Sequence, residues 1–339
     1  MNKKKKCLIY IEEAIYIQEV LFVIVGYIKK QNKPVDLIGK IKYFFEIVKV
    51  TQCNMGYVLE VPFKGKADKM IKRVSKIIKK LEIDNIVFSN ELVYTEFSFK
   101  IIDNLDKINV CNGKRLMSYM QYDIFMYILN IQKIQVNNAD VFFLIKKDDR
   151  LNLNFLSKFI KNCKSVNIVT NDINRFRFLQ NSIYEKENIL IGISNNKNKA
   201  LKRARYIFNV NMNEDELKKY KIDRSAIIVN LNNMIYYNTP GFNGININYF
   251  QISLPDEYIE CFENINEYNE FDLAKLYEAY LEKNMAFEVY TLESEKRECI
   301  WEEWKNRAKI IGLIGNNGII SKSEFEEISR LNNLTKIKN

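Results

Sequence analysis

The sequence predicts an α/β protein whose second part is a doubly wound parallel sheet. Short apolar segments alternate with amphipathic helical segments along residues 138–253, a pattern typical of parallel strands covered by helices on both faces. With only 4 prolines and 11 glycines among 339 residues, the chain favours long regular elements. We therefore expect an N-terminal α/β domain (1–137), the doubly wound domain (138–253) and a C-terminal helical segment (254–339) that packs on the body.

In the first part, apolar runs rich in β-branched and aromatic residues predict strands, and helical periodicity of apolar residues predicts helices. The clearest helix covers residues 68–81, whose apolar side chains share one face while its lysines lie elsewhere. The expected strands are residues 7–11, 41–51, 57–63, 85–88 and 108–110, and the expected helices are residues 14–30, 68–81, 97–105 and 115–132.

In the second part, six short apolar strands alternate with helices or short loops. This order is typical of a Rossmann-like domain, in which parallel strands and helices wind in two directions from the middle of the sheet. The expected strands are residues 141–145, 165–170, 189–193, 206–210, 226–230 and 244–248, and the expected helices are residues 151–162, 173–184, 197–204 and 214–220.

In the third part, helical periodicity predicts helices over residues 273–281 and 295–311. Gly312, Gly315 and Gly318 follow at intervals of three. No Lys-Ser/Thr pair comes directly after them, so we interpret them as a helix end and a turn and not as a phosphate loop. Ser321 and Glu324 predict the start of a final helix.

The chain contains no histidine. This excludes Ser-His-Asp and Cys-His catalysis and histidine metal sites, so acid–base chemistry would fall to Asp, Glu, Lys, Tyr or Cys. The six cysteines lie far apart without a CxxC pair, which argues against a zinc ribbon or a disulfide scaffold and suits a reducing compartment. We expect no metal site.

The N-terminus begins like a signal peptide, with four lysines at positions 3–6 before apolar residues. However, Glu12, Glu13 and Glu19 interrupt the apolar stretch, and the longest uninterrupted run, residues 20–28, is too short to span a bilayer. The sequence therefore predicts a cytoplasmic protein with no membrane partner.

The net charge of +10 is unevenly distributed. Residues 256–303 contain 15 acidic and 4 basic residues, whereas the rest of the chain is strongly basic. We expect the acidic segment to dock on the basic body or to shield it. Nucleic-acid binding through the basic N-terminal part is an alternative, but the basic residues are spread over many helices and no aromatic-interleaved patch stands out.

The turn after the first strand of the second part lacks the glycines that a dinucleotide-binding fold places there. Residues 146–150 read Lys-Lys-Asp-Asp-Arg. A Cβ would stand where the backbone must approach the pyrophosphate, and Asp148 and Asp149 would repel it. This turn argues against conventional dinucleotide binding.

The carboxyl ends of the predicted parallel strands supply the candidate binding residues, because ligands of doubly wound sheets bind at that edge. An acidic residue after the second strand would contact a ribose hydroxyl and an Arg would accommodate a 2′-phosphate. Asp172 could equally begin the next helix, and the asparagines could simply stabilise turns. The candidates are Thr170, Asn171, Asp172, Arg175, Ser194, Asn195, Asn209 and Asn211.

Residues 166–248 resemble the NADP-binding half of shikimate dehydrogenases and glutamyl-tRNA reductases. The likeness lies in Thr170-Asn171-Asp172 with Arg175, in an Ala-Leu…Ala-Arg segment at 200–205, and in the strand that ends Asn209-Val210-Asn211. The resemblance implies a Rossmann fold, NADP as cofactor and oxidoreductase activity. Neither the glycine fingerprint nor a local motif for either family's catalytic residues is present.

We interpret the chain as a Rossmann-like protein that has lost conventional dinucleotide binding and acts as a binding or regulatory protein, or takes an unconventional small-molecule ligand. An NAD(P)-dependent oxidoreductase with Lys, Asp or Tyr as proton donor is the first alternative, and nucleic-acid binding is the second. Whether the chain is an enzyme, and with which cofactor, stays open at the level of sequence.

Overall fold

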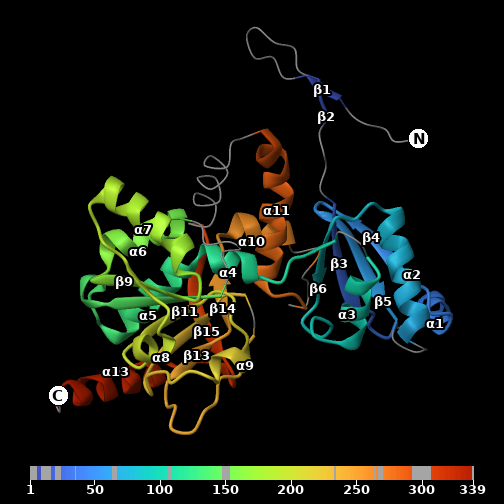
Figure 1. The fold of residues 1–339 in the computed structure, drawn as a ribbon. Helices are drawn as coiled ribbons and strands as arrows, with labels where there is room; N and C mark the ends of the chain where they lie inside the picture. The colour runs from blue at the N-terminus through green and yellow to red at the C-terminus, as the bar shows by residue number, and fades with distance from the viewer. Residues whose placement is uncertain are drawn as a thin grey trace. The chain divides into compact units, whose positions relative to one another are not determined.

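The structure is a computed structural model that describes most of the chain (Figure 1). The described residues are 6–8, 17–19, 24–34, 36–62, 67–105, 108–146, 153–232, 234–262, 265, 270–291 and 307–337. The chain divides into two compact units: unit 1 is Met1–Gly113 with Leu254–Arg307, and unit 2 is Lys114–Ser253 with Ala308–Asn339. The C-terminal segment is thus shared between the units, and residues 114–137 belong to the second one.

Unit 1 is built on a mostly parallel five-stranded sheet of order β4-β5-β3-β6-β7. Strand β4 pairs antiparallel with β5 at one edge, and the other pairings are parallel. The strands are β3 (Val25–Lys30), β4 (Lys49–Cys53), β5 (Gly56–Val61), β6 (Asn85–Phe88) and β7 (Asn109–Val110). Strands β1 (Lys6–Leu8) and β2 (Ile17–Glu19) form a separate antiparallel pair.

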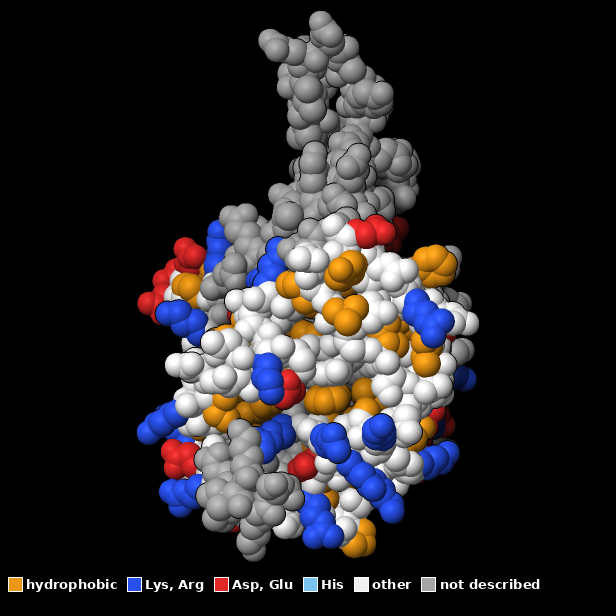
Figure 2. All heavy atoms as spheres, turned by 60° about the vertical axis from the view of Figure 1, so that its left-hand side comes forward, with side chains coloured by type: hydrophobic (Ala, Val, Ile, Leu, Met, Phe, Trp, Pro, Cys, Tyr) orange, Lys and Arg blue, Asp and Glu red, His pale blue; other side chains and the backbone are white. Residues whose placement is uncertain are grey.

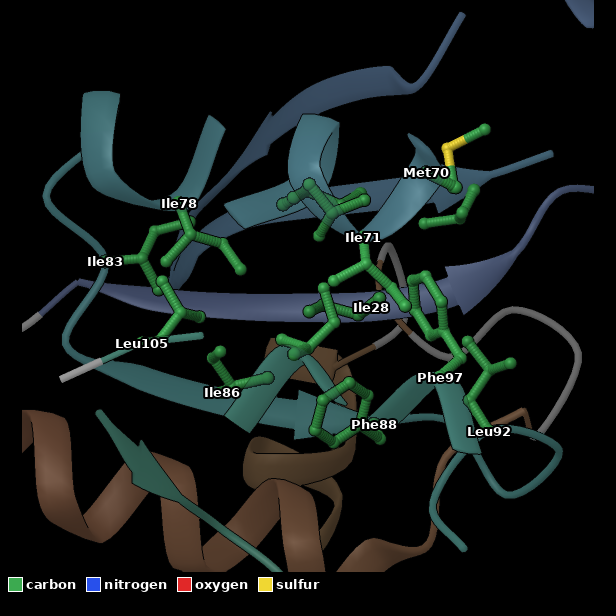
Figure 3. Close-up of a cluster of buried hydrophobic side chains, with 14 residues drawn as sticks. Ile28, Met70, Ile71, Ile78, Ile83, Ile86, Phe88, Leu92, Phe97 and Leu105 are labelled. Atoms are coloured by element: carbon green, nitrogen blue, oxygen red, sulfur yellow. The ribbon is translucent and has the colours of Figure 1, made fainter. Parts of the chain in front are cut away.

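Helices α2 (Ala67–Lys80) and α3 (Glu96–Asp103) close one face of this sheet over a shared apolar core. Figure 3 shows Ile71 of α2 facing Ile28 of the central strand, with Phe88 and Phe97 nearby, and Ile78 of α2 next to Ile83. The predicted helix 68–81 is confirmed as α2. Helix α11 (Leu273–Thr291) packs on β6, and helix α10 (Asp256–Phe262) precedes it in the chain.

Two predictions in the first part are wrong. Residues 14–30 were expected to be a helix, but the described ones form β2 and β3. The run around Val25 is buried on both faces of a parallel sheet, where a strand loses its alternation and resembles a buried helix. Residues 41–51 were expected to be a strand, but α1 (Leu37–Phe44) occupies their first half.

Unit 2 contains a six-stranded, wholly parallel sheet of order β10-β9-β8-β11-β12-β13. In chain order this is 3-2-1-4-5-6, the Rossmann order, and it confirms the predicted doubly wound fold. The strands are β8 (Asp140–Ile145), β9 (Ser165–Thr170), β10 (Gly192–Ser194), β11 (Tyr206–Asn209), β12 (Ile227–Asn230) and β13 (Ile245–Ile247).

Side chains alternate between the two covered faces of the central strands. Phe143 and Phe208 stack on each other and meet Phe125 and Phe159 on one face, whereas Leu144 and Ile207 join the apolar core on the other. The helices are α4 (Lys114–Tyr119), α5 (Gln121–Gln132), α6 (Leu153–Asn162), α7 (Ile173–Glu187), α8 (Lys197–Leu201) and α9 (Glu214–Leu217), with a 3-10 turn at Val136–Asn138.

The C-terminal part of unit 2 is not purely helical as expected. Strands β14 (Tyr249–Ser253), β15 (Lys309–Gly315) and β16 (Gly318–Ile319) form an antiparallel sheet. The predicted helix 295–311 is therefore wrong for residues 309–311, and its first residues up to 306 lie outside the described ones. Gly318 has φ +108 and lies just after the β15–β16 turn, a backbone conformation that favours glycine.

The last helix begins where the sequence predicts it. The Ser321 hydroxyl accepts a hydrogen bond from the Glu324 backbone, and the Glu324 carboxylate accepts from the Ser321 backbone, which is a reciprocal capping arrangement. Helix α13 (Lys322–Ile337) then packs on α5. The Gln132 amide donates to the Phe325 carbonyl, and the Tyr206 hydroxyl donates to Gln132 Oε1, so the helix is tied to the central sheet.

No described helix is long and apolar enough to cross a membrane, and the cytoplasmic location stays a prediction. On the face shown in Figure 2, the Lys and Arg side chains of the described residues are dispersed among uncharged and hydrophobic ones.

Replacing Phe208 with Ala should lower the free energy of unfolding by about 3–5 kcal/mol, since the buried ring contacts three others and its loss leaves a cavity. Urea unfolding followed by circular dichroism would measure this. Phe178 is 80% exposed on α7, so Phe178→Ala is the control and should change the value by less than about 0.5 kcal/mol. Equal losses in both variants would contradict the aromatic core.

Candidate functional site

The carboxyl edge of the unit 2 sheet is where a doubly wound fold binds its ligands. The chain turns in opposite directions from β8 and β11, which are neighbours in the sheet, so the crevice of such a fold opens above these two strands. The residues after β8, β9, β10 and β11 all lie along this edge. It therefore gathers the predicted candidates, which come from three separate segments of the sequence.

Two interactions join the loops across the crevice. The Lys146 backbone N–H, just after β8, donates to Asn211 Oδ1 at 2.7 Å. The Lys146 ammonium lies 2.5 Å from a carboxylate oxygen of Glu216 on α9, and this contact holds the pKa of Glu216 below its usual range. Residues 147–150 of the glycine-free turn lie outside the described residues. Within the described residues, a hydrogen bond and an ion pair thus connect the loops that follow β8 and β11.

The predicted residues after β9 and β10 make local hydrogen bonds. The buried Thr170 hydroxyl accepts from the Asp172 backbone at 3.1 Å. Asn171 Oδ1 accepts from the Lys197 ammonium at 2.7 Å, which also donates to the Tyr220 hydroxyl at 3.1 Å. The structure thus brings Asn171 to the start of α8, where Lys197 is almost fully buried.

The remaining candidates near this edge either make local hydrogen bonds or are exposed. Ser194 Oγ accepts from the Asn196 backbone at 3.1 Å, and the Asn195 carbonyl accepts from the Lys197 backbone at 3.0 Å. Asp172 is exposed at the start of α7. Arg175 is on α7, but its side chain is outside the described part. None of these contacts by itself distinguishes a ligand site from a local turn.

Asn209 belongs to a network of buried asparagines that the sequence did not reveal. Its Oδ1 accepts from the Met212 backbone at 3.0 Å, and its Nδ2 donates to Asn230 Oδ1 at 2.9 Å. Asn230 is fully buried at the end of β12 and donates in turn to Asn246 and Asn248 at 2.7 and 3.1 Å. The network therefore links the ends of β11 and β12 to β13.

The network continues to the C-terminal hairpin. Asn246 and Asn248 each donate to Asn316 Oδ1 at 2.8 Å, and both also donate to the Ile235 carbonyl. Because a buried amide without partners destabilises a protein, these shared bonds fix the β12–β13 loop and the β15–β16 turn together. The sequence has no local pattern that indicates this network, because its asparagines come together only when β11, β12 and β13 lie side by side in the sheet.

Lys114 is a buried amine beside the same network. Its ammonium, at the start of α4, donates to the backbone carbonyls of Asn230 and Asn248 at 3.0 and 2.5 Å. These two acceptors favour the charged form, but burial outweighs them and lowers the pKa of Lys114 to about 8. A lysine with this pKa can exchange a proton near neutral pH, which an exposed lysine does only rarely.

A pocket of about 320 Å3 lies beside the network, away from the crevice above β8 and β11. Asn246 and Asn316 of the network form part of its wall, and Asn238 and Asn317 present further amides. Tyr237 and Phe242, whose rings make an edge contact at 4.9 Å, form the apolar side. The pocket thus combines neutral amides and an aromatic wall with the carboxylate of Glu324, which already accepts from the Ser321 backbone and hydroxyl. This arrangement suits a small polar molecule.

Metal-binding clusters are lacking in the described ranges: no three Cys, Asp or Glu side chains there lie close enough together to hold an ion. Cys53, Cys111, Cys163 and Cys261 are not part of a disulfide. Burial raises the pKa of the Cys163 thiol to about 12 and that of Cys53 above its ordinary value. Both are therefore poor nucleophiles.

The strand order, with helices on both faces, defines unit 2 as a Rossmann-like α/β domain. No protein-family model matches the chain, and no curated protein matches its sequence. Among solved structures it is similar to L-tryptophan dehydrogenase from Nostoc punctiforme, at 11% identity over 86% of this chain and 91% of that one with a TM-score of 0.33.

Two further structures are similar at the same level. Ornithine carbamoyltransferase from Pyrococcus furiosus is 11% identical over 77% of this chain and 84% of that one, with a TM-score of 0.26. NAD-dependent malic enzyme from Thermotoga maritima is 14% identical over 61% and 59%, also with a TM-score of 0.26. Similarities this weak carry no argument about a substrate or a cofactor.

Replacing Asn230 with Ala should lower the free energy of unfolding by about 2–4 kcal/mol, because Asn246 loses an amide donor in a buried site and a cavity remains. Chemical denaturation would measure the loss. Asn181, exposed on α7, provides the matched control Asn181→Ala, which should stay within about 0.5 kcal/mol of the parent. A neutral Asn230→Ala would show that the network does not support the fold.

Stability should also depend on the titration of Lys114. Its pKa is about 8 in the folded chain and 10.5 ordinarily, so between these values the unfolded chain binds more protons and the folded state gains stability as pH rises. At about 1.4 kcal/mol per pKa unit, the advantage of the parent over Lys114→Met should grow by about 3 kcal/mol from pH 7.5 to 11.

Urea titrations at both pH values would measure this change, with Lys202→Met, at an exposed position, as the control for loss of one positive charge. If the difference in the free energy of unfolding between the parent and Lys114→Met stays constant with pH, the Lys114 amine has the same pKa in the folded and the unfolded chain.

Proposed function

We propose that this chain is a binding or regulatory protein whose Rossmann-like unit takes a small polar molecule and not a conventional dinucleotide. The observation that carries the proposal is the connection across the crevice, where Lys146 bonds to Asn211 through its backbone and to Glu216 through its side chain. These contacts engage groups that the pyrophosphate of a cofactor would have to use.

The connection disfavours a pyrophosphate in two ways. A dinucleotide fold offers backbone N–H groups after its first strand to the phosphate oxygens, and the N–H of Lys146 already donates to an amide oxygen. Glu216 also places a carboxylate beside this loop, and its charge would repel a phosphate. An exposed ion pair contributes only about 0–1 kcal/mol to stability. The Glu216 carboxylate and the engaged Lys146 N–H therefore disfavour a pyrophosphate more than the strength of the ion pair does.

We place the ligand in the pocket beside the asparagine network. Asn238, Asn317 and the ring of Tyr237 line it, and neutral amides match hydroxyl, amide or carbonyl groups without demanding a charge. The volume of about 320 Å3 is at the lower end of the range for small-molecule sites. A ligand there would contact Asn316 and so could influence the hairpin that the network holds.

An oxidoreductase is the second candidate, and Lys114 is the observation that favours it. A buried amine with a pKa near 8 at the carboxyl ends of β12 and β13 could donate a proton to a carbonyl substrate. This activity would require the crevice to accept a nicotinamide cofactor, so the same binding measurement separates the two candidates.

Calorimetric titration of the full-length protein with NAD+, NADH, NADP+ and NADPH should give no affinity in the micromolar range. The double variant Lys146→Ala/Glu216→Gln removes the repelling carboxylate together with the lysine ammonium. It should still show no micromolar affinity, since the backbone N–H at position 146 remains engaged by Asn211. A micromolar dissociation constant for any of the four nucleotides with the parent protein would overturn the proposal and favour the oxidoreductase.

A thermal-shift screen with neutral polar metabolites tests the pocket, because a ligand that binds the folded state raises the midpoint by mass action. A compound that stabilises the parent should lose its effect in Asn238→Leu and Asn317→Leu and keep it in the control Asn181→Leu. A shift that survives both pocket variants would place the ligand elsewhere. Retention on heparin that falls steeply with salt would instead support nucleic-acid binding.

A further inference from the structure

Helix α1 of unit 1 presents an apolar face to solvent. Its residues Leu37, Ile38 and Phe44 are 74%, 65% and 68% exposed, and none of the residues of α1 is buried. The capping residue Phe45, at 62%, and Ile41, at 49%, continue the same surface. At 100° per residue, these five side chains fall within roughly 120° of the helix circumference, so they form one continuous stripe.

Lysines border this stripe on both sides. On the helical wheel, Lys40 lies next to one edge of the stripe and Lys42 next to the other, and both are exposed. Lys33 before the helix is exposed as well, whereas Lys49 after it is exposed but paired with Glu60 at 2.8 Å. The two acidic residues of this segment are otherwise engaged: Asp36 caps the helix by accepting from Gly39, and Glu46 lies near Lys69 and Arg73.

The helix is held in this orientation by the rest of unit 1. The Arg73 guanidinium of α2 donates to the Glu46 carbonyl at 2.7 Å and to the Phe45 carbonyl at 3.4 Å. These bonds satisfy backbone groups at the end of α1, and they fix the helix to α2 with its apolar stripe outward. The exposure of the stripe is therefore part of the fold.

We propose that α1 docks unit 1 on an anionic lipid membrane surface. An amphipathic helix with large apolar residues on one face and lysines beside it lies in the headgroup region, where the apolar side chains enter the acyl boundary and the lysines meet lipid phosphates. This binding needs no membrane-spanning segment, so it is compatible with the short apolar runs from which the sequence predicted no membrane partner.

The charges favour a membrane over a second copy of the chain. A two-fold pairing through the stripe would bring Lys40 and Lys42 near the same lysines of the second copy, and like charges in close contact oppose association. An anionic surface complements the same lysines. Strand β4, at the sheet edge next in sequence, carries Lys49 as well, and an edge lysine discourages pairing with another strand.

Cosedimentation of the full-length protein with vesicles tests the proposal. The parent should sediment with vesicles of phosphatidylcholine and phosphatidylglycerol in equal parts and stay in the supernatant with phosphatidylcholine alone. The apolar variant Leu37→Ser/Phe44→Ser and the charge variant Lys40→Glu/Lys42→Glu should each weaken binding by about tenfold or more. Raising the salt concentration should weaken the parent in the same direction.

Matched variants in unit 2 serve as controls. Phe178→Ser/Leu190→Ser removes two side chains that are 80% and 73% exposed, and Lys202→Glu/Lys219→Glu makes the same change of charge at exposed positions; both should bind like the parent. Circular dichroism should show that every variant is folded.

Two outcomes would overturn the proposal. One is a parent protein that binds neither vesicle. The other is binding that the unit 2 variants weaken as much as the α1 variants do. A concentration-dependent dimer, detected by sedimentation velocity and abolished by Leu37→Ser/Phe44→Ser in a protein that ignores vesicles, would assign the stripe to a second copy.

Discussion

The requirement that buried amides find hydrogen-bond partners governs the half of unit 2 that contains β11, β12 and β13. Asn209, Asn230, Asn246 and Asn248 are almost fully buried at or near the carboxyl ends of adjacent strands, where an unpartnered amide would destabilise the fold. They satisfy one another and reach Asn316 in the C-terminal hairpin. The order of β11, β12 and β13, the course of the loop after β12 and the position of the hairpin therefore depend on each other.

The network also determines what the edge of the sheet can offer to a ligand. Asn209 was a candidate binding residue, but its amide already bridges Met212 and Asn230. Contacts of Lys146 with Asn211 and Glu216 connect the loops on the two sides of the crevice above β8 and β11. The open polar surface is found beside the network, in the pocket next to the hairpin. A scaffold with the Rossmann strand order thus has a pocket lined by amides beside β13, in addition to the crevice above β8 and β11.

The two units differ in where their polar and apolar side chains lie. Unit 2 places amides in its interior and along one pocket, whereas unit 1 holds an apolar stripe outward on α1 through the bonds from Arg73. The sequence predicted a strand there, because β-branched and aromatic residues dominate residues 41–51. Helix capping by Asp36 starts α1 at Leu37, before this segment, and the helix continues to Phe44. The strand begins only at Lys49.

The sequence by itself determined the doubly wound sheet of unit 2 and the amphipathic helix α2, because their apolar periodicity depends only on neighbours along the chain. It also placed Thr170, Asn171, Ser194 and Asn209 at one edge, because parallel strands align their carboxyl ends. Tertiary structure alone decided that residues 25–30 form a central strand, that residues 309–319 form a hairpin, and that Lys114 joins Asn230 and Asn248. Burial on both faces hides the period that tells strand from helix, and contacts between residues more than a hundred positions apart leave no local pattern in the sequence.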